Sequence, residues 1–169
     1  MKSHEDRVLG IQSAFSGATD QLIACLQQLD DHIVTRAPAG AWTPAQIGCH
    51  VALTNEFLAA VLSGAVADMN VSRPNGFQET LATLQLPDRV KTFPALEPPA
   101  GATRGEAVAK LRQSAEVFAK ALPAATSERC GTMCVKMPFG VVFSIYEVGE
   151  FAAGHIHRHI GQVNRTVAS

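Results

Sequence analysis

The chain has 169 residues, of which 47% are hydrophobic and 17% charged, and its formal net charge is −1. This composition is typical of one ordinary globular domain with a sizeable core, so we expect residues 1–169 to form a single domain. A charge near zero, without a block of Lys or Arg, argues against nucleic acid or an anionic membrane as the direct partner.

The N-terminus and the cysteines predict a cytoplasmic protein. The first seven residues are charged and no apolar run follows them, so we expect no signal peptide, and no run of 18 apolar residues suggests a membrane span. The cysteines do not form the disulfide framework of a secreted domain; they are Cys25, Cys49, Cys130 and Cys134.

The first predicted helix is marked by apolar or small residues that recur three and four positions apart from Val8 to Ile33. This spacing keeps one stripe on one side of a helix for about seven turns. Pro38 ends the helix, because proline disfavours a helical residue before it. Cys25 lies on the inward stripe, where a buried structural thiol is expected.

The second predicted helix begins at Pro44, which suits the first helical position. Thr43 can cap the free N–H groups, and Gln46 completes a capping box with it. The helix is expected to run to about Gly64.

His50 lies on the apolar stripe of this second helix, one turn after Ile47 and one turn before Thr54. An inward histidine of this kind can be a hydrogen-bonded core residue or a ligand. Cys49 is turned by about 100° from it, which gives the thiol a packing role or at most an indirect one.

The segment 65–102 loses the helical period and is punctuated by proline. Residues Phe77 to Leu86 could form a short helix within it. A connection of this length is uncommon inside a compact domain. It would let the second helix be followed by a parallel neighbour, as in some four-helix bundles.

The third predicted helix opens with a capping box of Thr103 and Glu106, continues with 3-4-3-4 spacing and stops at Pro123. Ala124 to Phe143 is a second connector, with a possible extended piece at 141–143. Its cysteines, Cys130 and Cys134, have CxxxC spacing rather than the CxxC of a zinc knuckle or thioredoxin site. They could pair or bind a metal, but unpaired loop cysteines fit better.

The last predicted helix opens with a capping box of Ser144 and Glu147. It places His155 and His159 one turn apart on one face, whereas His157 points away. A strand would place all three histidines on one face, but apolar and polar residues do not alternate over residues 150–154, as they would in a strand. The helix contains three glycines, which cost about 1 kcal/mol each against alanine unless they permit a close approach.

Four amphipathic helices predict an all-α four-helix bundle. Its core would hold His50, His155 and His159. Burying three histidines is costly unless their nitrogens are used. A divalent metal would use them, and three neutral imidazoles with an open position form a catalytic rather than a structural pattern. We therefore expect these three residues to be metal ligands.

Two motifs carry a resemblance to a known family. Trp42 to Val51 resembles the start of helix 2 in DinB-like (YfiT-like) proteins, "W-[ST]-x-x-x-[IL]-x-x-H-[LV]". Residues 139–163 resemble their closing pattern, "G…E…H-x-x-R-H-x-x-Q-[IV]". The two motifs cover about a fifth of the chain, and together they are fairly specific.

The resemblance implies a four-helix bundle with a long connection between helices 2 and 3. It also implies a divalent metal, commonly nickel or zinc, on the matching residues His50, His155 and His159. His157 has no role in the family. Members are often homodimers, and characterised relatives include thiol-dependent S-transferases and isomerases and metal-dependent hydrolases.

The leading hypothesis is a metal-dependent enzyme acting on a small-molecule substrate, either in transfer with a low-molecular-weight thiol or in hydrolysis. No glutamate lies inside the motif as it does in HExxH, so spacing nominates no general base. Glu56 and Glu147 are weak candidates. The alternatives are a non-catalytic metal-binding or stress-related bundle and a structural dimer whose histidines only form hydrogen bonds.

Overall fold

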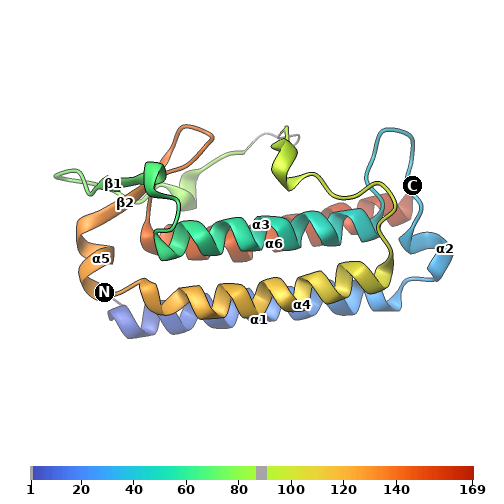
Figure 1. The fold of residues 1–169 in the computed structure, drawn as a ribbon, viewed down its shortest axis with the longest axis horizontal. Helices are drawn as coiled ribbons and strands as arrows, with labels where there is room; N and C mark the ends of the chain where they lie inside the picture. Colours follow the sequence, from blue (N-terminus) through green and yellow to red (C-terminus); the bar gives the residue numbers. More distant parts are fainter. Residues whose placement is uncertain (1, 87–90) are drawn as a thin grey trace.

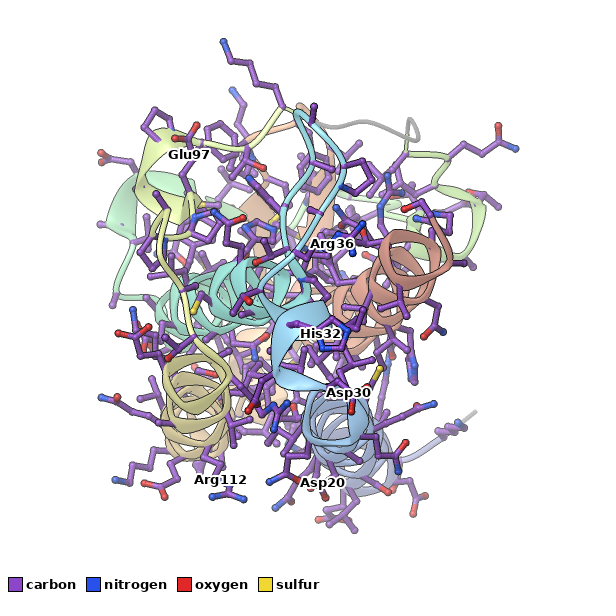
Figure 2. The ribbon with its side chains drawn as sticks, turned by 90° about the vertical axis from the view of Figure 1, so that its right-hand side faces the viewer. Asp20, Asp30, His32, Arg36, Glu97 and Arg112 are labelled. Atoms are coloured by element: carbon purple, nitrogen blue, oxygen red, sulfur yellow. The ribbon has the colours of Figure 1, made fainter. Side chains whose placement is uncertain are left out.

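The structure is a computed structural model that describes residues 2–86 and 91–169, and it is mostly helical (Figure 1). Its four long helices are α1 (His4–Gln28), α3 (Pro44–Ser63), α4 (Arg104–Ala121) and α6 (Ile145–Ala168). They lie side by side: α3 packs on α4 and α6, and α1 packs on the other side of the same two helices. Figure 2, which looks along the helices, shows them in two layers of two.

The long connector joins two parallel neighbours, as predicted. Helices α3 and α4 run in the same direction, and the described parts of the connector between them, 65–86 and 91–103, lie along the outside of the four helices (Figure 1). The shorter helices are α2 (Asp31–Val34), η1 (Ala67–Met69), η2 (Leu81–Thr83), η3 (Pro94–Leu96), η4 (Leu122–Ala124) and α5 (Ser127–Thr132).

A small antiparallel sheet makes the fold mostly helical rather than all-α. Its strands are β1 (Asn70–Ser72), β2 (Met133–Lys136) and β3 (Val142–Ser144), in the order β1-β2-β3. Cys134 pairs with Val71 on one side, and Val135 pairs with Phe143 on the other. The predicted extended piece at 141–143 is therefore strand β3, and it leads directly into α6.

The three predicted capping boxes are all present. Thr43, Thr103 and Ser144 each accept a hydrogen bond from the backbone three residues on, and the Gln or Glu at that position bonds back to the cap backbone. Helix α3 ends at Gly64, whose φ of 83° is left-handed and suits glycine. These local signals place the starts of α3 and α6, which carry the histidines.

The first helix is shorter than predicted. Helix α1 ends at Gln28 because Leu29 is extended, and residues 31–34 form the separate α2. The guanidinium of Arg104 donates to the Leu29 carbonyl and forms an ion pair with Asp31 at 2.8 Å. A partner distant in sequence thus binds the carbonyl freed at the break. Cys25 is half-buried rather than fully buried.

Two predictions for the connectors were wrong. Residues Phe77 to Leu86 contain only the single turn η2 and no α-helix. The second connector contains α5 and β2 in addition to the expected extended piece, so its cysteines do not lie in a loop. Cys130 on α5 and Cys134 on β2 are consequently buried free thiols, and burial raises the pKa of both. The prolines of the first connector include Pro87, which lies outside the described residues.

One finding corrects the sequence analysis on membrane spans. By length and composition alone, α3 would qualify as a helix able to cross a membrane. Most of it is buried inside the protein, where it packs on α4 and α6. Core helices pass the same test, so this helix is weak evidence for a membrane.

Gly149 allows α1 and α6 to approach closely. A Cβ at this position would lie 2.6 Å from Cγ2 of Ile11, whereas a Cβ at Gly154, in the same helix, would meet nothing within 4 Å. We expect Gly149→Ala to lower the free energy of unfolding by about 1–3 kcal/mol through overpacking. Gly154→Ala should raise it by up to about 1 kcal/mol through helix propensity. Urea unfolding measures both; equal effects would contradict the close approach.

Candidate metal centre

The three predicted ligands meet at one point. His50 comes from α3, and His155 and His159 come from neighbouring turns of α6. One ring nitrogen from each residue lies within 4.8 Å of the other two. The ring centroids are 4.4 Å apart between His155 and His159 and 4.8 Å apart between His50 and His159. His157 is exposed on the same helix, as the periodicity predicted.

Hydrogen bonds at the outer ring nitrogens orient two of the rings. With the proton on Nδ1, His50 donates to the Leu96 carbonyl at 2.8 Å, and His159 donates to Oε1 of Gln162 at 2.7 Å. This tautomer leaves the Nε2 lone pair of each ring directed into the cluster. Histidines that bind metals are commonly held in this way, through a carbonyl or carboxylate on the other nitrogen.

The distance between the two histidines of α6 fits a shared ion. Nε2 of His155 lies 3.0 Å from Nε2 of His159. Zinc–imidazole bonds are about 2.0–2.1 Å long, which allows two ligand nitrogens on one ion to lie about 3 Å apart. Nδ1 of His155 is buried and has no hydrogen-bond partner among the described residues, so this ring, unlike the other two, has no hydrogen bond that orients it from outside the cluster. The residues present therefore suit a divalent cation bound by nitrogen.

The environment keeps the rings neutral. Burial lowers the pKa of His50, although its bond to Leu96 partly offsets this effect. Burial also lowers the pKa of His155 well below its ordinary value, with further contributions from His159 and His50. For His159, burial first and the charge of His50 second lower the pKa to about 4. Neutral imidazole is the form that binds a metal.

These pKa shifts predict a pH-dependent stability of the metal-free chain. An unfolded histidine takes up a proton near pH 6.5, whereas His159 in the folded chain does so only near pH 4. Stability should therefore fall as the pH drops from 6.5 to 4, by up to about 1.4 kcal/mol per pH unit for each such histidine. Urea unfolding with a chelator present measures the slope. His159→Gln should reduce it and His157→Gln should not; equal slopes would contradict the buried neutral ring.

Neither glutamate considered as a base reaches the cluster. Glu147 is buried, and its carboxylate accepts bonds from the backbone of Ser144 at 2.8 Å and of Thr80 and Leu81 at 2.6 Å each. Glu56 is exposed on α3. Glu147 is therefore a structural acid that ties the connector to the start of α6.

A cleft of about 1370 Å³ opens above the histidines. Residues 38–42, residues 91–97, the turn between β2 and β3, and the second half of α6 line it. The Trp42 ring lies 4.8 Å from the His50 ring, and the Phe151 ring lies 6.1 Å from that of His155. Sequence analysis did not single out Leu96 or Phe151 for the site. Leu96 acts through its backbone carbonyl, which every residue type has, so its identity could not indicate this role. Gln162, by contrast, lies within the closing motif that the sequence analysis quoted.

Fold and site together define a mostly helical protein in which two packed helices present three histidines, able to hold a metal ion, to an open cleft. The sequence model of the DinB superfamily matches residues 14–163, and the chain belongs to this superfamily. The match includes all three histidines. Searches of curated proteins and of solved structures gave no match.

Proposed function

We propose that this chain is a metal-dependent enzyme built on a DinB-type four-helix bundle. His50, His155 and His159 would bind a divalent cation, zinc or nickel, because imidazole suits both. The observation that carries the proposal is the convergence of three neutral ring nitrogens below an open cleft. Three protein ligands with an open side are typical of catalytic rather than structural sites.

The chain's own residues would hold the centre in shape. The Leu96 carbonyl and the Gln162 amide fix the orientation of two rings. Trp42 and Phe151 place aromatic surface beside His50 and His155, which limits the access of water. When bound, the ion would lower the pKa of a thiol or water at its open position and so supply a nucleophile near neutral pH.

The charges around the cleft favour transfer with a thiol over hydrolysis. Among the described residues that line the cleft, Glu97 is the one acidic side chain, and it is exposed on the rim. A low-molecular-weight thiol brings its own nucleophilic sulfur and needs no protein base once its pKa is lowered. We therefore propose thiol-dependent transfer to a small-molecule substrate, in a cytoplasmic homodimer, with hydrolysis as the second reaction class.

Metal content combined with a thiol screen tests the proposal. The purified chain, wild type and His50→Ala, would be analysed for zinc and nickel. Both would then be assayed with glutathione, cysteine and N-acetylcysteine against an electrophilic aromatic acceptor. We expect bound metal and thiol consumption in the wild type, and loss of both in His50→Ala. Metal content near zero, or turnover that survives His50→Ala, would overturn the proposal.

Chelation separates the enzyme from a non-catalytic metal-binding bundle. An ion needed for folding should lower the melting temperature sharply when it is removed. An ion at an open catalytic site should abolish turnover with a smaller change in melting temperature. The non-catalytic alternative would be favoured if the chain binds a metal and needs it for folding, but turns over no thiol.

A further inference from the structure

The candidate centre has no negative partner of its own. Its three donors are neutral imidazoles, so a bound divalent cation would keep its full charge of +2. A charge held beside buried groups is costly unless an opposite charge accompanies it. A hydroxide or thiolate at the open position would balance part of this charge, and an anionic ligand in the cleft would balance the rest.

The side chains of the cleft add to this positive charge. Among the described residues that line the cleft, Lys91 and Arg165 are basic and Glu97 has the one acidic side chain, although the chain as a whole has a net charge of −1. The described side chains of the cleft thus carry more positive than negative charge. A concave site lined by one sign of charge attracts ligands of the opposite sign.

Arg165 lies where it could bind a negatively charged ligand in the cleft. Its guanidinium lies back along α6 over Gly161, where Nη1 is 3.4 Å from the position that a Cβ would take. Arg165 and His159 line the same cleft. A single guanidinium matches the two oxygens of one carboxylate in a planar, bidentate arrangement.

The cleft also has aromatic side chains in its lining. Phe93 and Phe139 line it and are 48% and 36% exposed, so their rings are accessible to a ligand. The Phe139 ring lies 5.7 Å from that of Phe151, so the aromatic surface extends down towards His155. Aromatic surface with a few polar groups is typical of sites for small organic molecules.

We propose that the cleft binds a small organic carboxylate with an aromatic or similarly bulky apolar body. The carboxylate lies between the histidine cluster and Arg165, and the body packs against Phe93, Phe139 and Phe151. This inference rests on the proposed function, since it names the substrate class of the same site. In this proposal, Arg165 makes the cleft select negatively charged ligands over neutral ones.

Trp42 provides a readout at the site that does not depend on activity. It is the one tryptophan of the chain, and its ring lies 4.8 Å from that of His50. The zinc-loaded full chain would be titrated with 3-phenylpropanoate and with the uncharged 3-phenylpropanamide at constant ionic strength. Tryptophan fluorescence would be recorded, and elemental analysis would establish the zinc content of each sample.

Arg165→Gln is the test variant and Arg112→Gln the matched control. Arg112 is exposed on the outer face of α4, far from the cleft (Figure 2). We expect the wild type to prefer the carboxylate over the amide by about tenfold or more, as hydrogen bonds between charged groups allow. Arg165→Gln should remove most of this preference, and Arg112→Gln should leave it unchanged.

The outcomes separate this inference from the proposed function. Equal binding of carboxylate and amide, no binding of either, or equal effects of the two substitutions would overturn the inference. If the same samples contained the normal amount of zinc, the proposed metal centre would still be supported. A chain that binds no zinc but still prefers the carboxylate through Arg165 would overturn the proposed function and support the inference.

Discussion

Replacing His155 by alanine should reduce the affinity of the chain for zinc by more than about a hundredfold, since even the loss of a group that orients a ligand costs about 10–100-fold. His155 would supply one of three nitrogens, and its Nε2 lies only 3.0 Å from that of His159. Two remaining imidazoles cannot hold the ion in the same geometry. Competition with a chromophoric chelator measures the change.

His157→Ala is the control for this prediction. This residue lies on the same helix, two positions away, and is exposed. It removes an imidazole without touching the cluster, so zinc affinity should be unchanged. If His155→Ala and His157→Ala lost affinity to the same extent, zinc would be binding to surface histidines instead of the predicted centre.

Replacing Glu147 by leucine should lower the free energy of unfolding by about 3 kcal/mol or more, because a buried donor left without its acceptor costs about 1–3 kcal/mol. The carboxylate accepts bonds from the backbone N–H groups of Ser144, Thr80 and Leu81. Leucine would leave these groups unsatisfied at the start of α6 and at the beginning of η2. Urea unfolding at pH 7 measures the loss.

Glu56→Leu is the matched substitution at an exposed helical position. It should change stability by less than about 0.5 kcal/mol, as is usual for surface positions. A loss at Glu147 no larger than that at Glu56 would show that the backbone groups find other partners. It would also remove the argument that this glutamate is structural.

Local sequence signals predicted the parts of the fold that depend on neighbouring residues. The capping boxes at Thr43, Thr103 and Ser144 each lie within four residues, and each marks a real helix start. The break after Gln28 was missed because Leu29 and Ile33 continue the apolar stripe. The group that binds the freed carbonyl, Arg104, is 75 residues away.

Strands β1 and β2 and the pairing of the sheet were missed for a similar reason, although an extended piece at β3 was expected. Strand β1 pairs with β2 across more than sixty residues, so that Val71 faces Cys134. Each strand is only three or four residues long, too short for alternation to be distinguished from a loop. Pairing over such a separation depends on the packed helices that bring the two connectors together.

The histidine cluster was predictable because helical periodicity fixes which residues share a face. His155 and His159 are one turn apart, and His50 lies on an apolar stripe, so each had to point inward. Their distances could not be predicted, because they depend on how α3 and α6 pack. The bond from His50 to Leu96 was not predictable either, since every non-terminal residue offers a backbone carbonyl.

That bond has a consequence for how the site can diverge. The group that orients His50 is a main-chain oxygen, so no side-chain replacement at position 96 deletes it. The flanking residues Phe93 and Glu97 line the cleft on the same short segment. Their side chains can change while the carbonyl keeps its place, so the lining of the cleft can vary without any change in the group that orients His50.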